Sequence, residues 1–336
     1  MSARIAFLGD TLLGGAAQTL LDEYGTDYAI EGIRSIWADT DVAVANHEGP
    51  LTLNDDESAK LETGKKRYWY KGHPDSAHTL AAAGVRVVSL GNNHILDFGT
   101  TGLFDTLDAL DGAGIAHCGA GKDDRAARRA ALLDVGGLRV GFLSVMQRYK
   151  MYLAEKTYAT RDQPGAALLR TSRICADIAA LRDMVDLCVV LVHWGRNYRD
   201  VTSLQKRLAH EIRGAGADLI IGHHPHIPQP VTVLDGVPVA YSLGNAAFGT
   251  PGRYRSGRPP YGLIAIADVE RHRVTSLELR LIHVDNAIVN FQPQPVDDAD
   301  AQTYLKTLYE PAQLRSLASG ALGCSHCPRA REPADW

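Results

Sequence analysis

Short apolar runs recur along the chain, and each one leads into glycine or a polar residue. The runs are Ile5–Leu8, Val42–Ala45, Val87–Leu90, Val189–Val192, Ala217–Ile221 and Val239–Leu243. Runs that are apolar at nearly every position over this length are typical of strands buried within a sheet. The pattern therefore predicts buried strands whose carboxyl ends open into polar loops.

Helical patterns separate several of these runs. We expect helices at Gln18–Glu23, Asp75–Ala83, Thr101–Ala113, Arg173–Met184 and Ser203–Arg213. Alternation of strands and helices is typical of α/β proteins. Ala131–Leu143 is an exception, because the Gly136-Gly137 pair between two apolar stretches predicts an antiparallel hairpin.

The pattern changes in the last third of the chain. From Pro230 to Ile288, short strands with alternating apolar positions follow one another, as in Leu263–Ala267 and Val274–Leu279. Alternation of this kind predicts strands with one face toward a core. We therefore expect a mixed sheet or a second sheet packed on the first, which gives an α/β sandwich.

Length and composition favour one soluble catalytic domain. No linker interrupts the 336 residues, so we place that domain at residues 1–290, and residues 291–336 are expected to form a helix, Ala299–Leu317, and a flexible tail. No apolar run is long enough to cross a bilayer. Met1–Arg4 lacks the features of a signal peptide, so the expected location is cytoplasmic. The sequence predicts no particular oligomeric state.

Charge and cysteine content exclude several classes of protein. A net charge of −4 without a basic arm argues against nucleic acid or a membrane as partner, and we interpret Lys65–Arg67 as a solvated face. Five cysteines are too few for a disulfide scaffold. Cys324 and Cys327 form a CxxC, but two thiolates are too few for a structural zinc site.

Polar side chains follow the predicted strands at their carboxyl ends. They are Asp10, Asn46–Glu48, Asn92–His94, His193, His223–His226 and Asn245. Ligands bind at this edge of open α/β sheets, so we expect a single polar site there. Gly222–His226 is its densest part, with three histidines in four residues.

These side chains form a metal-binding set. The candidate ligands are Asp10, Glu48, Asn93, His193, His224 and His226. Carboxylate, amide and imidazole donors together suit one divalent ion of Mn, Zn or Fe, because imidazole disfavours Mg and Ca. Two ions would generate hydroxide for attack on a phosphoryl group, whereas one ion would stabilise the enolate formed when a base removes an α-proton. No organic cofactor is expected.

Six short motifs follow one another along the chain, each at the end of a predicted strand. They are Gly9-Asp10, Asn46–Thr52, Asn92–Gly99, His193–Gly195, Gly222–His226 and Tyr241–Asn245. This series resembles the CapA, or poly-γ-glutamate capsule biosynthesis, family of the calcineurin-like metallophosphoesterase superfamily. The resemblance covers about residues 3–250. It implies a four-layer α/β/β/α sandwich with the site at the strand ends.

The resemblance also implies roles for individual residues. Asp10 matches the aspartate of the superfamily's Asp-x-His motif, and Glu48 takes the place of a metal-bridging aspartate. Asn93 corresponds to an amide ligand and His94 to the acid that contacts substrate. The remaining ligands of the superfamily correspond to His193, His224 and His226. Leu12 stands where the superfamily has a ligating histidine, which weakens one of its two metal positions.

Three functions are consistent with this resemblance. CapA-like proteins have been connected with peptide epimerisation, in poly-γ-glutamate and in lasso peptide tailoring. The leading hypothesis is therefore a peptide epimerase without organic cofactor, which inverts a Cα of a peptide or polyamide substrate in natural-product or capsule-type biosynthesis. One alternative is a metal-dependent phosphoesterase that uses His94 as acid. Another is a non-catalytic subunit of a poly-γ-glutamate synthesis complex.

Further residues are candidates for catalysis and substrate binding. Proton transfer is assigned to a set of four residues: His94, His193, His223 and Asp10. Substrate contact is assigned to Asn92, Trp69, Arg196 and Asn245. Trp69 is interpreted either as an apolar wall of the site or as core packing. Arg196 and Arg199 offer bidentate contact to a carboxylate or phosphate, with solvent exposure the preferred interpretation for Arg199.

Overall fold

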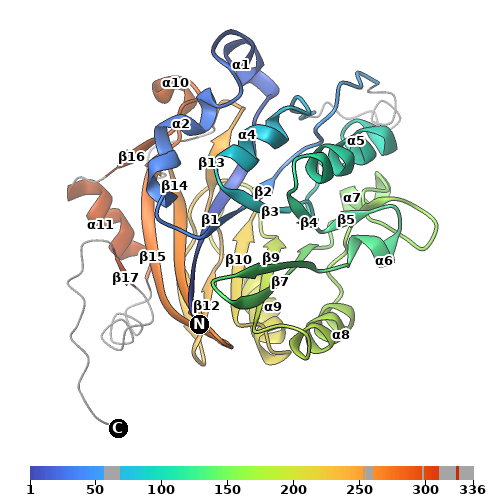
Figure 1. Cartoon of the computed structure of the whole chain (residues 1–336), viewed down its shortest axis with the longest axis vertical. Coiled ribbons are helices and arrows are strands. Elements are labelled where there is room, and N and C mark those ends of the chain that lie inside the picture. The colour runs from blue at the N-terminus through green and yellow to red at the C-terminus, as the bar shows by residue number, and fades with distance from the viewer. Residues whose placement is uncertain (57–68, 253, 255–259, 297–298, 310–322, 325–336) are drawn as a thin grey trace.

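Two β-sheets lie face to face, and helices cover the outer face of each (Figure 1). The computed structural model describes residues 1–56, 69–252, 254, 260–296, 299–309 and 323–324. Lys65–Arg67 and Cys327 lie outside these residues. Among the helices of the described chain, none combines the length and apolarity that crossing a membrane requires.

The first sheet joins strands from both ends of the chain. Its spatial order is β16 (Gln294–Val296), β15 (Arg273–His283), β14 (Tyr261–Glu270), β1 (Ala3–Leu12), β2 (Val42–His47), β3 (Val85–Ser89) and β4 (Ala116–Cys118). Strands β1 to β4 run parallel, and β14 pairs antiparallel with β1. In addition, β13 (Asn245–Phe248) pairs with the end of β1, and β17 (Gly323–Cys324) pairs with β15.

The second sheet comes from the middle of the chain. Its order is β11 (Val231–Leu234), β12 (Val237–Ala240), β10 (Leu219–His223), β9 (Leu187–His193), β7 (Leu138–Met146) and β6 (Ala131–Val135). The predicted hairpin is confirmed as β6–β7, with φ of 58° at Gly136 and 78° at Gly137. Glycine adopts this left-handed conformation without steric cost, so the pair permits the tight turn. A short separate ladder joins β5 (Ala120–Gly121) to β8 (Gly165–Ala166).

The predicted helices are confirmed, with ends shifted by a few residues. Those on the first sheet are α1 (Gln18–Tyr24), α4 (Ser76–Ala82) and α5 (Gly99–Gly112), and those on the second are α8 (Thr171–Arg182) and α9 (Ser203–Gly214) (Figure 1). The sequence reasoning missed the short helices α2 (Tyr28–Arg34), α6 (Asp124–Ala127), α7 (Lys150–Ala154) and α10 (Asn286–Val289).

Strand alternation explains the layers. In β1, Ile5 and Phe7 face the core between the two sheets, whereas Ala6 and Leu8 face the core beneath the helices. The same alternation in β9 sends Val189 and Leu191 inward and neighbouring valines toward α8 and α9. Each fully buried large aliphatic or aromatic side chain contributes roughly 1.5–3 kcal/mol. The four-layer α/β/β/α sandwich is therefore confirmed.

The C-terminal segment corrects one prediction. We expected a helix at Ala299–Leu317, but the helix in the structure, α11, covers only Ala299–Thr307. Two residues later, Tyr309 forms a parallel bridge with Val231. Pairing with a strand edge is incompatible with helical backbone, so the helix ends before it. Ala301 and Leu305 are buried in the core between the sheets. The domain boundary at residue 290 stays a prediction.

Candidate active site

The predicted polar side chains meet where the parallel strands of both sheets end. Asp10 of β1 is aligned with Asn245 of β13, and His193 of β9 with His223 of β10. The structure places at this edge a set of buried residues, each no more than 8% exposed: Asp10, Glu48, Asn92, Asn93, His94, His193, His223, His224, His226 and Asn245.

Backbone strain marks the loop after β10. His224 has φ of 96° and His226 has φ of 58°, a region that non-glycine residues rarely adopt. Such conformations cost on the order of 1–3 kcal/mol each and persist only where the surroundings enforce them. Here the His224 amide donates to Asp10 Oδ2 (3.2 Å), and the Tyr198 amide donates to the Pro225 carbonyl (2.8 Å). The loop is thus held in the conformation that aims both imidazoles inward.

A glycine lets this loop pass close to its neighbours. A Cβ at Gly222 would lie 2.0 Å from the Tyr241 carbonyl oxygen and 2.5 Å from Trp194 Nε1. Trp194 Nε1 donates to the same carbonyl at 2.8 Å. Any larger residue at position 222 would therefore displace the histidine loop.

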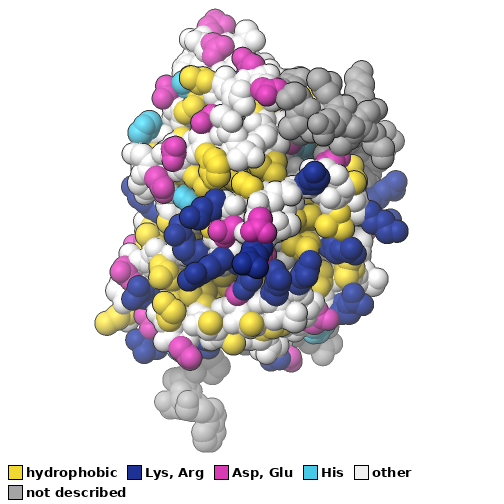
Figure 2. Space-filling model, turned by 90° about the vertical axis from the view of Figure 1, so that its right-hand side faces the viewer, with side chains coloured by type: hydrophobic (Ala, Val, Ile, Leu, Met, Phe, Trp, Pro, Cys, Tyr) yellow, Lys and Arg dark blue, Asp and Glu magenta, His cyan; other side chains and the backbone are white. Residues whose placement is uncertain are grey.

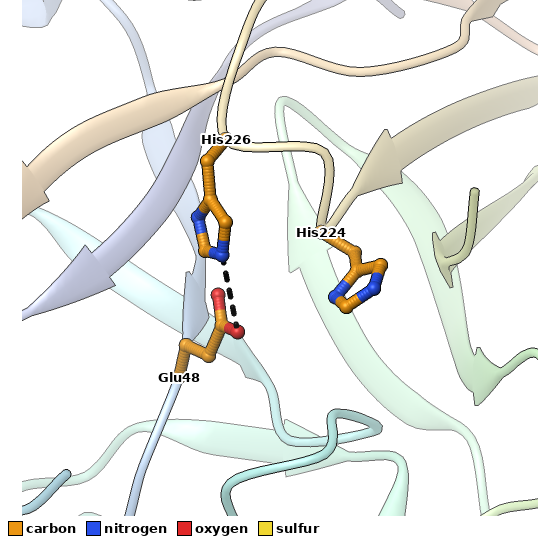
Figure 3. Close-up of side chains that lie close together, drawn as sticks. All are labelled: Glu48, His224 and His226. Atoms are coloured by element: carbon orange, nitrogen blue, oxygen red, sulfur yellow. Dashed lines mark ion pairs between the residues drawn. The ribbon is translucent and has the colours of Figure 1, made fainter. Parts of the chain in front are cut away.

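Glu48 lies at the centre of the cluster. Its Oε1 is 3.6 Å from His193 Nε2 and 3.9 Å from the Nε2 atoms of His94 and His226, each beyond hydrogen-bonding distance. Figure 3 shows the contact with His226. Both oxygens are buried, and within the described residues neither has a hydrogen-bond partner. Burial, with the nearby Asp10 carboxylate, raises the pKa of Glu48 well above its usual value.

The donors around Glu48 fit a divalent cation. Two overlapping sets, Asp10–Glu48–His193 and Glu48–His224–His226, each bring their ligand atoms within 4.8 Å of one another. A buried carboxylate without a hydrogen-bond partner is costly, and a cation between these donors would remove that cost. Leu12, which is fully buried, contributes no ligand. The sequence-predicted ligands therefore converge, and Glu48 belongs to both sets.

His94 is held so that one nitrogen faces Glu48. Its Nδ1 lies 2.7 Å from Asp97 Oδ2, and its backbone amide donates to Asn92 Oδ1 at 3.1 Å. The Tyr70 ring lies against it, with ring centroids 4.2 Å apart. Because Asp97 accepts the Nδ1 proton, the neutral imidazole keeps a lone pair on Nε2.

His226 is held by different partners. Its Nδ1 lies 2.9 Å from Asn245 Oδ1 and 3.3 Å from Asp10 Oδ2. Burial alone lowers the pKa of His226, but the Glu48 and Asp10 carboxylates outweigh this and raise it to about 9. Burial alone raises the pKa of Asp10, yet contact with His226 leaves it below its usual value.

Burial disfavours the charged form of the other three histidines of the cluster, His193, His223 and His224. Burial, together with repulsion from neighbouring imidazoles, holds the pKa of His193 well below its usual value and lowers that of His224 to about 3. Burial also lowers the pKa of His223, whose Nε2 lies 3.2 Å from the Leu8 carbonyl oxygen of the facing sheet. His223 therefore contacts a backbone carbonyl of the facing sheet, whereas His224 and His226 contact its side chains.

A cavity of about 700 Å³ opens onto this cluster. Asn93, His94 and His226 form its polar end. Its walls include five aromatic side chains: Trp69, Tyr70, Tyr152, Tyr198 and Phe248. The arrangement combines proton-transfer groups and metal-type donors with an apolar binding space.

Several predicted substrate contacts have other partners. The Asn92 amide donates to the His47 carbonyl (2.7 Å), and Asn245 donates to Tyr254 Oη (3.0 Å) while it accepts from His226. Arg196 is exposed and does not line the cavity, whereas Trp69 does. Their contacts with substrate stay predictions.

Sequence reasoning missed some residues of the cavity. Tyr70, Tyr152, Tyr198 and Phe248 carry no motif of their own, and only the position of Tyr70 beside Trp69 offered a signal. Asp97 could have been found from its spacing, because it follows His94 by three residues in the same turn. The aromatic walls come from four separate segments of the chain, which no local pattern connects.

A family model and individual relatives both relate this chain to bacterial capsule synthesis proteins. Residues 4–250 match the model of the bacterial capsule synthesis protein PGA_cap. The capsule biosynthesis protein CapA of Bacillus anthracis is 30% identical over 73% of this chain and 59% of its own length. A probable polyglutamine synthesis accessory protein of Mycobacterium tuberculosis is 37% identical over 61% of this chain and 55% of its own length. The chain thus spans less than two thirds of these relatives.

A solved structure supports the fold. The calcineurin-like phosphoesterase YfkN from Bacillus subtilis superposes with a TM-score of 0.55 over 91% of this chain and 98% of that chain, at 14% sequence identity. At this identity the likeness concerns the arrangement of the layers and extends to no particular activity.

Proposed function

The chain belongs to the PGA_cap family of bacterial capsule synthesis proteins, and from this premise we propose that it is a peptide epimerase. Its reaction is the inversion of a Cα in a peptide or polyamide by acid/base proton transfer. Its relatives, which include a capsule biosynthesis protein and a probable polyglutamine synthesis accessory protein, support a role in capsule-type biosynthesis.

One observation carries the proposal: two cavity-lining histidines come from different sheets and meet at the same carboxylate. His94 follows β3 of the first sheet, and His226 follows β10 of the second. The Nε2 atom of each lies 3.9 Å from Glu48 Oε1. Inversion at carbon requires one group on each face of the substrate, and this pair supplies them.

The proton transfers follow from the bonds that hold each ring. His94 Nε2 takes the proton from Cα, and the electron pair of the broken C–H bond moves onto the neighbouring carbonyl oxygen. His226 Nε2 then delivers a proton to the opposite face of Cα, and the pair returns to form the new C–H bond. His94 loses its proton to solvent and His226 regains one, so each inversion introduces one solvent hydrogen.

Asp97, Asp10 and Asn245 act as positioning residues. Asp97 holds the tautomer of His94 in which Nε2 carries no proton, and Asn245 with Asp10 fixes the ring of His226. Asp10, Glu48 and His193 are the residues that would hold a divalent ion, which leaves His226 for proton transfer. When bound, such an ion supplies Lewis-acid polarisation of the carbonyl beside Cα.

Hydrogen exchange in D₂O tests this proposal. The protein is incubated with poly-γ-L-glutamate and, separately, with a mixture of synthetic peptides, and the amino acids are analysed by chiral chromatography and mass spectrometry. We expect D-residues that carry one deuterium at Cα. His94→Gln and His226→Gln should each lower the exchange rate roughly 10²–10⁴-fold, the usual contribution of a general acid or base.

His210→Gln provides the matched control, because His210 is an exposed histidine on α9. Its exchange rate should equal that of the unchanged protein. Exchange that persists in both His94→Gln and His226→Gln would contradict the proposed roles. Absence of deuterium from every probe, in protein loaded with Mn, Zn or Fe, would contradict epimerisation itself.

A metal-dependent phosphoesterase is the second candidate. The observation in its favour is that two donor sets share Glu48, as a carboxylate bridging two ions would require. In that reaction His94 donates a proton to the leaving oxygen. Hydrolysis of bis(p-nitrophenyl) phosphate that rises with added Mn and disappears in Asp10→Ala would support it.

A further inference from the structure

A basic region lies apart from the cavity. Residues 122–173 contain eleven Lys and Arg against five Asp and Glu, although the whole chain has a net charge of −4. This segment includes α6, α7 and the start of α8. Figure 2, which looks onto this side of the molecule, shows Lys and Arg side chains gathered in a band across it.

Two hollows lie on either side of α6. One, of about 410 Å³, is lined by four arginines: Arg125, Arg161, Arg170 and Arg173. The other, of about 200 Å³, is lined by Lys122 and Arg129 together with apolar side chains that include Phe104 and Leu107. Arg125 belongs to the first hollow and the adjacent Ala126 to the second, so the short helix separates them.

The two acidic side chains that line the first hollow, Asp123 and Asp124, are already engaged. Asp124 accepts from Arg173 at 2.6 Å and from Arg128 at 3.2 Å. Arg128 also binds Asp177 in a bidentate manner, at 2.6 and 2.8 Å. The Asp123 carboxylate caps α6 by accepting the Ala126 amide at 2.7 Å. No acid lining the first hollow is therefore left to neutralise its remaining arginines.

Five exposed cations line the two hollows without a salt bridge to any described residue. They form what we call the basic face, and they are Lys122, Arg125, Arg129, Arg161 and Arg170. All five are exposed, and among the residues that the structure describes none of them forms an ion pair. Like charges gathered in this way repel one another, and an anionic partner would relieve the repulsion.

We propose that the basic face is a docking surface for an acidic, carboxylate-rich segment of a polypeptide. Four of its five cations are arginines, whose planar guanidinium groups match carboxylates in a two-point geometry. The hollow beside Lys122 and Arg129 also offers Phe104, which is 38% exposed, to the apolar side chains of such a segment. A polypeptide segment with both carboxylates and apolar side chains can therefore bind in both hollows.

The basic face is connected to the cavity by a short stretch of chain. Tyr152 of α7 lines the cavity, and the chain continues from it to Thr160 and Arg161, which line the first hollow. Tyr158 fixes this connection, because its hydroxyl donates to the Gln147 carbonyl (2.6 Å) and accepts from the Tyr149 amide (2.9 Å). The docking surface is a separate site and does not depend on the reaction proposed for the cavity.

Fluorescence anisotropy with a labelled oligo-L-glutamate tests the docking surface. The variant Arg125→Gln/Arg161→Gln/Arg170→Gln should bind the probe about tenfold more weakly or worse, since each exposed ion pair contributes modestly. The control is Arg207→Gln/Arg271→Gln/Arg273→Gln, which removes the same charge from exposed arginines that the structure places elsewhere. The control should lose less than twofold.

Several results would overturn the proposal. They are equal weakening in both triple variants, no binding by the unchanged protein, and tighter binding of an oligothymidylate of equal charge. Thermal unfolding shows that each variant is folded. A charge-reversed variant, Arg125→Glu/Arg161→Glu/Arg170→Glu, should lose oligo-L-glutamate and gain affinity for oligo-L-lysine, and failure to gain it would also count against the surface.

Discussion

The candidate active site and the basic face both gather ionisable side chains, but water reaches only one of the two regions. Glu48 is fully buried and has no hydrogen-bond partner among the described residues, whereas Arg125, Arg161 and Arg170 are exposed. A buried charge in a low dielectric interacts strongly with its neighbours, while an exposed charge is screened by water and salt. Substitution should therefore have large, local effects in the first region and small, cumulative effects in the second.

Glu48→Gln should have the largest effect. Because Glu48 belongs to both donor sets, affinity for Mn, Zn or Fe should fall at least on the order of 100-fold. The metal-free protein should lose little stability, since the substitution removes a buried carboxylate that accepts no hydrogen bond among the described residues, and its charge contacts with the histidines are long. Metal titration and thermal unfolding, with and without metal, measure both effects.

Glu270→Gln is the matched control for this prediction, because Glu270 is a partly exposed carboxylate at the end of β14. It should leave metal affinity unchanged. If Glu48→Gln bound metal as well as the unchanged protein, the buried region would not be a cation site, and the contrast between the two regions would fail.

Asp97→Asn should have the next largest effect, on exchange and not on folding. Loss of the carboxylate at 2.7 Å removes the group that fixes the tautomer of His94, so the rate of Cα exchange should fall roughly 10–100-fold. The measurement is the D₂O assay, with Asp105→Asn on α5 as an acid outside the cluster. Equal rates in Asp97→Asn and the unchanged protein would show that Asp97 does not position the ring.

Arg128→Gln should have an intermediate effect on stability. This arginine binds Asp177 in a bidentate manner and also contacts Asp124 beneath the basic face. Because the pairs are partly solvated, we expect the free energy of unfolding to fall by only about 1 kcal/mol. Urea unfolding measures the change, and Arg161→Gln, which removes an unpaired exposed arginine, should change it by less than about 0.5 kcal/mol.

A change in salt concentration should have the smallest effect, and it should affect binding at the two regions differently. An increase in ionic strength from about 0.01 to 0.15 M shortens the Debye length from roughly 30 to 8 Å. Binding of oligo-L-glutamate to the basic face should weaken several-fold, whereas metal affinity at the buried cluster should change by less than twofold. Similar salt dependence in the two titrations would indicate that the buried cluster is more hydrated than its burial implies.

The strand ends were predictable from the sequence because the signal is local. An apolar run followed by glycine and a polar residue specifies a buried strand and its exit, as at Phe7–Asp10 and Ile221–His223. The candidate ligands follow, since parallel strands end at a common edge. The length of the last helix was not predictable, because it ends where Tyr309 pairs with Val231, a contact between distant segments.

The sequence by itself determined the strands, most helices and the residue types at the site, since each depends on the spacing of neighbouring residues. The tertiary structure decided which of these residues face one another. It turned His223 toward Leu8 and His226 toward Glu48, although the two histidines are three residues apart. It also gathered arginines from α6 and α8 onto one face. Such contacts depend on packing between segments far apart in the chain, which no local pattern records.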